Sequence, residues 1–125
     1  MPQLQAGDVI RVMAHFTNPS KPKFMICIDP QRFKYMLVNT DAYRLSMPAQ
    51  LTVTVGELPC LDHTSHIDTS KLVTLSAMET QYAIDADPRC YRGALPPDLR
   101  NSIKALIVQH GIMPNDQMAI VAANL

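Results

Sequence analysis

Short segments rich in β-branched and aromatic residues follow one another through the first 75 residues, and each is separated from the next by turn residues. Turns are marked by glycine, proline, asparagine and aspartate, which interrupt regular structure. No helical pattern alternates with these segments, so a parallel βαβ sheet is excluded. The spacing therefore predicts antiparallel strands at 7–16, 23–28, 33–40, 51–55 and 66–75, the first three of them as a meander.

One helix is predicted with clear start and stop signals near the C-terminus. Pro96 and Pro97 precede an apolar pattern of helical period, Asp98 lies in the first turn, and Gly111 follows the last turn. His110 falls at the helix C-terminus, where the helix dipole favours a protonated ring, and we assign it no function.

The other segments outside the strands are less regular. Ser76 and Glu79 resemble a capping box and predict a short helical stretch from 76 to 82. The residues from 113 onward fit either a second short helix, capped by Asn115 or Asp116, or a closing strand. The stretch 85–93 has no regular pattern and receives no assignment.

These elements predict a mainly β fold with a C-terminal helix. A chain of 125 residues, 47% of them hydrophobic, is long enough for a single domain spanning residues 1–125 with a real core. Five short antiparallel strands and one amphipathic helix indicate a small barrel of the SH3-like or OB-like kind, capped by the helix.

Charge and cysteine content restrict the cellular setting. Eleven basic residues balance eleven acidic ones, so the net charge does not steer the chain toward nucleic acid or membranes. Three cysteines without a CxxC pair argue against a disulfide framework and favour the cytoplasm. No apolar run approaches the roughly 18 residues that a membrane-spanning helix needs, so we expect no membrane segment.

The stretch CLDHTSHIDTSKLVTL, from Cys60 to Leu75, concentrates the polar chemistry of the chain. His66 and Asp68 are two apart, so on a strand they share a face, and a carboxylate there is expected to orient the imidazole for proton transfer. His63 is expected to assist. Two other interpretations stay open: a zinc site built on the C-x2-H-x2-H spacing from Cys60, which lacks the distant ligand pair typical of structural zinc, and ordinary surface residues of a loop and strand.

The order of several short motifs resembles the PemK/MazF-like toxin family. These are GDVIRV at the first strand, KPKFMICI at the second, YMLVNT at the third, HIDTSKLVTL at the fifth, and GALPPDL leading into the helix. The resemblance extends from Gly7 to about His110, and the order of the motifs carries it.

The resemblance implies an SH3-like barrel, a homodimer in the cytoplasm, and control by a cognate antitoxin protein. Many members of the family are endoribonucleases that cut single-stranded RNA without a metal or other cofactor, by attack of a ribose 2′-hydroxyl on the adjacent phosphate. Such a reaction needs a base, an acid and a positive charge near the phosphate oxygens.

The resemblance also implies a set of site residues. The family arginine falls on Lys21, which keeps the charge but loses the planar fork of a guanidinium. Together with the histidines, the expected catalytic set is Lys21, Thr40, His66 and Asp68, with Lys23, Asn39 and His63 in substrate binding and no metal ligands. The alternative is a non-catalytic member of the same fold that binds protein or nucleic acid, which the lysine substitution and the neutral net charge favour.

Overall fold

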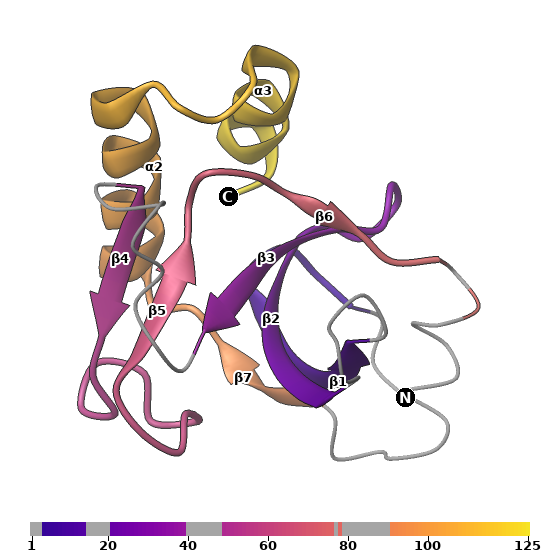
Figure 1. Cartoon of the computed structure of the whole chain (residues 1–125), viewed down its shortest axis with the longest axis vertical. Coiled ribbons are helices and arrows are strands. Elements are labelled where there is room, and N and C mark those ends of the chain that lie inside the picture. The colour runs from indigo at the N-terminus through magenta and orange to yellow at the C-terminus, as the bar shows by residue number, and fades with distance from the viewer. Residues whose placement is uncertain (1–3, 15–20, 40–48, 77, 79–90) are drawn as a thin grey trace.

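A strongly curled antiparallel sheet makes up the body of the protein, and two helices near the C-terminus pack against it (Figure 1). The structure is a computed structural model, and it describes residues 4–14, 21–39, 49–76, 78 and 91–125. The described strands and helices are β1 Asp8–Ala14, β2 Lys21–Asp29, β3 Lys34–Asn39, β4 Gln50–Val53, β5 Ser65–Asp68, β6 Val73–Thr74, β7 Tyr91–Ala94, α2 Pro97–His110 and α3 Asn115–Asn124.

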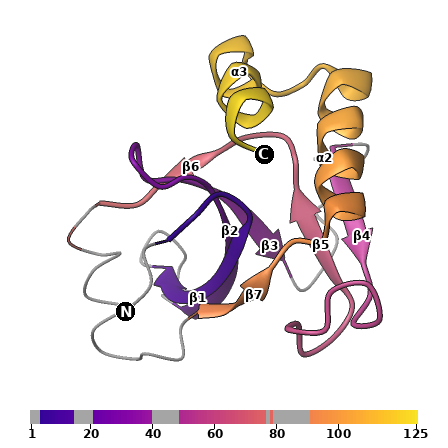
Figure 2. The same ribbon diagram turned by 180° about the vertical axis from the view of Figure 1, so that it is seen from behind.

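The first three strands form the predicted meander, because each is joined to the next and pairs with it antiparallel. The described sheet has the order β4-β5-β3-β2-β1-β7, and β6 pairs with β3 beside β5. Seen from behind, α2 lies across the β4–β5 end of the sheet, and α3 returns over the end nearer β6 (Figure 2). The prediction of a mainly β fold with a C-terminal helix is confirmed at this level.

The predicted strand from 66 to 75 is wrong in its continuity, because the structure splits it into β5 and β6. The carboxylate of Asp68 accepts hydrogen bonds from the backbone N–H and the hydroxyl of Ser70. This local turn competes with the sheet for the backbone, as aspartate side chains often do. Residues 69–72 therefore leave the sheet before the chain returns to pair with the other end of β3.

Strand β7 was missed by the sequence pattern, since Tyr91–Ala94 falls partly in the stretch that received no assignment. It pairs with β1, opposite Asp8 and Val9, with an irregularity in register after Val9. A strand of four residues that includes a glycine carries too little periodicity to be recognised locally.

The long helix α2 agrees with its start and stop signals. It begins at Pro97 and ends at His110, and Gly111 follows in the left-handed conformation typical of a helix C-terminus. Of the two options for the last segment, helix is the correct one, but neither Asn115 nor Asp116 caps it with its side chain; Pro114 occupies that position. The helical stretch predicted at 76–82 lies almost entirely outside the described residues.

The sheet buries apolar side chains on both faces, in two separate clusters. The first packs against the helices, through residues such as Ile26, Val38 and Ile67 of the sheet and Ile103 of α2. The second lies on the opposite face and consists of Ile10, Val12, Met25, Cys27, Tyr35, Leu37 and Leu75. Burial raises the pKa of the Cys27 thiol to about 12, with help from the negative charges of Asp8 and Asp29, so this cysteine remains a thiol.

Candidate functional site

Four polar side chains form a row across neighbouring strands of the sheet: Lys23 on β2, Asn39 on β3, His66 on β5 and Thr52 on β4. The strand register places Asn39 opposite His66 and His66 opposite Thr52. Lys23 joins the row through a hydrogen bond to Asn39. Directly paired residues of antiparallel strands point to the same side of a sheet, so all four share a face. We call this set the polar row.

The polar row lies on the face opposite the helices. Lys23 lies two residues from Met25 on β2, and Asn39 lies two residues from Leu37 on β3, so they face the same side as these members of the second cluster. Lys23, Asn39 and His66 are half-buried and Thr52 is exposed. The row therefore borders the second core at one end of the sheet, where its polar groups reach solvent.

Hydrogen bonds hold the two functional groups of the row in place. The Lys23 ammonium donates to the Asn39 side-chain oxygen at 2.7 Å. The hydroxyl of Thr52 lies 3.0 Å from Nδ1 of His66. A cation and an imidazole are thus each anchored by an uncharged neighbour on the next strand, and Nε2 of His66 is the ring atom away from that anchor.

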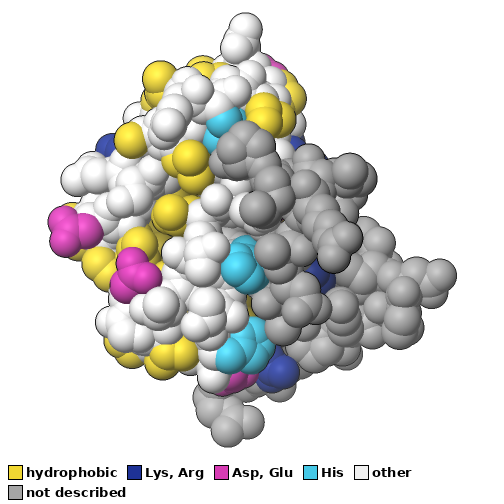
Figure 3. Space-filling view, turned by 60° about the vertical axis from the view of Figure 1, so that its left-hand side comes forward, with side chains coloured by type: hydrophobic (Ala, Val, Ile, Leu, Met, Phe, Trp, Pro, Cys, Tyr) yellow, Lys and Arg dark blue, Asp and Glu magenta, His cyan; other side chains and the backbone are white. Residues whose placement is uncertain are grey.

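His63 lies in the turn before β5 and is exposed. Its Nδ1 is 3.0 Å from the backbone oxygen of Thr64 and 3.2 Å from the hydroxyl of Ser65. A carbonyl oxygen only accepts hydrogen bonds, so this contact places a proton on Nδ1 and leaves Nε2 for exchange with solvent or a ligand. Histidine side chains lie at separate places along the face shown in Figure 3.

Asp68 does not have the contacts that the sequence led us to expect. Its side chain is buried in the turn with Ser70, and among the described residues the hydrogen-bond partner of His66 is Thr52. The structure thus gives Asp68 a role in ending β5 and gives the imidazole a threonine in place of a carboxylate.

The structure describes the other two residues of the predicted catalytic set, Lys21 and Thr40, only in part or not at all. Lys21 begins β2, but its side chain is not among those described. Thr40 follows the last residue of β3 and lies outside the described residues. The structure therefore brings together Lys23, Asn39 and His66 of the predicted set. It adds Thr52, for which the sequence offered no signal, because strand pairing between β4 and β5 cannot be read from local patterns.

His110 has a different environment from the one predicted for a helix C-terminus. The N–H of Ile112 donates to His110 Nδ1 at 2.9 Å, and Nε2 lies 3.1 Å from the hydroxyl of Thr69. A ring that accepts at Nδ1 has no proton there, so the bond to Ile112 requires neutral imidazole. Burial lowers the pKa of His110 below its usual 6.5, although the nearby charge of Asp68 opposes the shift. The prediction that the protonated ring is favoured is wrong.

This environment predicts that stability falls on acidification. Because the pKa of His110 is lower in the folded state, the unfolded chain binds a proton at this residue first as the pH falls. The neutral His110 ring therefore contributes its full stabilisation of the fold above about pH 6.5, and this stabilisation declines at lower pH. Thermal melting between about pH 7.5 and 5 is the measurement. We expect His110→Asn, whose amide oxygen can replace Nδ1 as acceptor without titrating, to lose less stability than the wild type. Identical pH dependence of the two proteins would contradict this.

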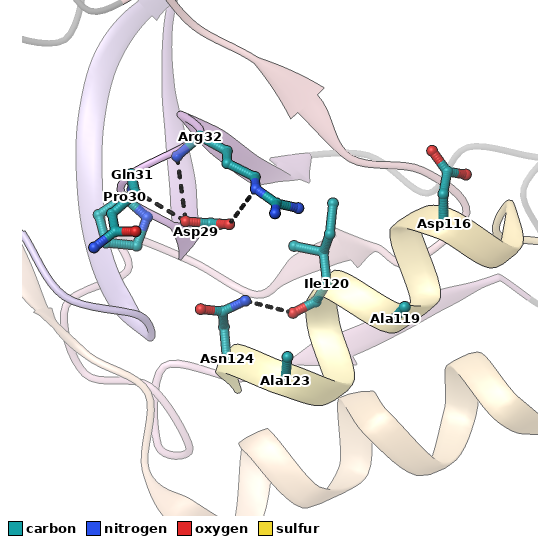
Figure 4. Close-up of a pocket in the computed structure, with 9 residues that line it drawn as sticks. All are labelled: Asp29, Pro30, Gln31, Arg32, Asp116, Ala119, Ile120, Ala123 and Asn124. Atoms are coloured by element: carbon teal, nitrogen blue, oxygen red, sulfur yellow. Dashed lines mark hydrogen bonds and ion pairs between the residues drawn. The ribbon is translucent and has the colours of Figure 1, made fainter.

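A groove of about 620 Å³ lies elsewhere, between the β2–β3 turn and α3 (Figure 4). The Asp29 carboxylate there accepts hydrogen bonds from the backbone N–H groups of Gln31 and Arg32, and Arg32 Nε lies 3.7 Å from its second oxygen. The Asn124 amide donates to the backbone of α3. These groups shape the turn and the helix end, and no residue of the polar row lines this groove.

No three histidine, cysteine, aspartate or glutamate side chains come together as metal ligands within the part of the chain that the structure describes. Cys60, His63 and His66 thus do not form the cluster that the C-x2-H-x2-H spacing suggested. Among the described helices, none is both long and apolar enough to cross a membrane. Comparison of the chain with models of protein families and with curated proteins gives no significant match.

Proposed function

We propose that this protein is a PemK/MazF-like endoribonuclease that cuts single-stranded RNA without a metal, and that the polar row with His63 is its site. The observation that supports the proposal best is the cross-strand alignment of Lys23 and His66 on either side of Asn39. Two strand spacings separate their backbones, roughly 10 Å, which long side chains can bridge around one phosphodiester group.

His66, His63 and Lys23 would supply the base, the acid and the positive charge that attack by the 2′-hydroxyl needs. His66 accepts the proton of the 2′-hydroxyl while the 2′-oxygen forms a bond to phosphorus. His63 donates a proton to the 5′-oxygen while the bond between phosphorus and the 5′-oxygen breaks. The product ends are a 2′,3′-cyclic phosphate and a 5′-hydroxyl. The Lys23 ammonium stabilises the negative charge on the phosphate oxygens during the step. Lysine at this position acts as a point charge and needs no bidentate geometry.

The finer parts of the family resemblance belong to the same proposal. They are an SH3-like barrel for the curled sheet, a homodimer in the cytoplasm, and a cognate antitoxin protein that blocks the site. Sedimentation of the purified chain tests the dimer directly, because a mass of one chain would remove that part without touching the chemistry.

Cleavage of a labelled single-stranded RNA in the presence of EDTA is the experiment that tests the function. We expect the wild type to leave a cyclic phosphate end. Lys23→Met is expected to lower the cleavage rate by about ten- to a hundredfold, because it removes the charge at the phosphate but retains the length of the side chain.

Lys71→Met is the matched control, since Lys71 is exposed and lies outside the polar row. Equal loss in both variants would point to a general effect of charge on RNA binding. Binding of RNA by the wild type without cleavage would favour the alternative of a non-catalytic binding module, and neither binding nor cleavage over a range of RNAs would reject the proposed substrate.

A further inference from the structure

The hydroxyl of Thr52 is the one described hydrogen-bond partner of the His66 ring. Histidine has two ring nitrogens, and the hydrogen bond at one of them decides which nitrogen carries the proton in the neutral form. A threonine hydroxyl can either donate or accept, so the distance of 3.0 Å alone leaves two arrangements. The chemistry of the polar row distinguishes them.

In the first arrangement the Thr52 hydroxyl donates to Nδ1, and the proton of the neutral ring is on Nε2. Nε2, the nitrogen away from Thr52, is then unable to accept a proton. Any proton that the ring takes up must go to Nδ1, so the Thr52 hydroxyl has to change from donor to acceptor. The hydrogen bond that anchors the ring would then have to reverse in every proton-transfer cycle.

In the second arrangement Nδ1–H donates to Thr52, and the lone pair is on Nε2. Proton uptake at Nε2 then leaves the Thr52 bond intact, and the imidazolium keeps the same orientation. Thr52 is exposed, so water satisfies its hydroxyl proton while its oxygen accepts from the ring. Only this arrangement keeps the same donor and acceptor in the bond between His66 and Thr52 through both protonation states. His63 shows the same pattern independently, because its Nδ1 faces a carbonyl oxygen.

We infer that Thr52 is a positioning residue that keeps neutral His66 in the Nδ1–H form, with Nε2, the nitrogen away from Thr52, as the proton-accepting atom. The chemical purpose of this arrangement rests on the proposed ribonuclease function. The proton uptake that selects this arrangement is part of that function as well, but the position of the ring proton can be observed in the protein without any substrate.

The test is nitrogen NMR of the neutral His66 ring, in the wild type, Thr52→Val and Thr52→Ser. Valine keeps the shape of threonine and removes the oxygen, and serine restores the oxygen. We expect the Nδ1–H signature in the wild type and in Thr52→Ser, and a shift toward the Nε2–H form in Thr52→Val. A wild-type ring protonated on Nε2, or a Thr52→Val ring with an unchanged signature, would overturn the inference.

Thr74→Val is the matched control. It is the same substitution at another exposed threonine, which also loses one side-chain hydrogen bond, to Lys34. We expect no change at His66 in this variant. A change equal to that in Thr52→Val would show that the effect is general and would count against a specific role of Thr52.

RNA cleavage provides the second readout. We expect Thr52→Val to lower kcat about ten- to a hundredfold with little change in KM, because the ring is misplaced while the RNA contacts remain, and Thr52→Ser to restore the rate. An unchanged kcat in Thr52→Val would overturn the positioning role in the reaction. If the wild type cuts no RNA, the proposed function fails, and the NMR result still decides whether Thr52 sets the ring.

Discussion

Replacing His66 with alanine is expected to lower the rate of RNA cleavage by about 10²- to 10⁴-fold, the usual contribution of a well-placed general base. His66 lies between Asn39 and Thr52 in the polar row, and no other described imidazole belongs to that row. Water alone would then have to accept the proton of the 2′-hydroxyl. The measurement is the single-turnover rate on a labelled RNA, as a function of pH, with EDTA present.

His110→Asn is the control for this experiment, because it removes an imidazole that is engaged with Thr69 and Ile112. It is expected to cut RNA at the wild-type rate near neutral pH. The dependence of the cleavage rate on pH should differ between the wild type and His66→Ala. A folded His66→Ala protein that cleaves at the wild-type rate would remove the polar row as the site of proton transfer.

Replacing Gly7 with alanine is expected to lower the free energy of unfolding by about 2–4 kcal/mol. Gly7 has a φ of +92°, a conformation that residues with a side chain rarely adopt, and a methyl group there would overlap the Arg100 guanidinium. Arg100 is held in that place by donating to the backbone oxygens of Ala6, at 2.9 Å, and Leu95. The substitution therefore combines backbone strain with displacement of a bonded cation.

Arg100→Ala separates these two causes, since it removes the side chain that the new methyl group meets. In the Arg100→Ala background, Gly7→Ala is expected to cost only the backbone strain. The double variant should therefore lose about 1 kcal/mol less free energy of unfolding than the sum of the losses in the two single variants. Denaturant unfolding of the four proteins measures this. Strictly additive losses would show that Arg100 does not restrict position 7.

The backbone of Gly7 also links three segments of the fold. The N–H of Gly7 donates to the backbone oxygen of Cys27 at 2.7 Å, and its oxygen accepts from Leu95 at 2.8 Å. One residue thus joins the start of β1 to the end of β2 and to the segment before α2. The sequence predicted a strand opened by this glycine, but the close approach of a side chain from the helix could not be foreseen.

Local patterns were sufficient where the deciding interactions are local. The first three strands follow from alternation and turn residues, and α2 follows from its prolines, its apolar period and Gly111, because each of these signals acts within a few residues. The same reasoning failed at Asp68, where a side-chain turn with Ser70 outweighed the alternation of the surrounding strand. It also failed at β7, which is stabilised by pairing with β1 rather than by its own residues.

The candidate site was predictable in its residue types and only partly in its partners. Histidines, a lysine and an asparagine near the strand ends were visible in the sequence, and the pairing of β2, β3 and β5 brings Lys23, Asn39 and His66 together. The pairing of β4 with β5 introduced Thr52 and left Asp68 in its turn. Two residues two apart on one strand share a face, but a residue directly opposite on the next strand is closer, so the cross-strand neighbour became the partner of the ring.

The sequence by itself determined the class of fold, the meander of the first strands, the position of the long helix and the kinds of side chain at the candidate site. Only the tertiary structure decided the strand order, the break between β5 and β6, the neutral state of His110 and the contact of His66 with Thr52. The physical reason is that propensity and periodicity act along the chain, whereas register, burial and hydrogen-bond partners depend on residues far apart in sequence that the sheet brings side by side.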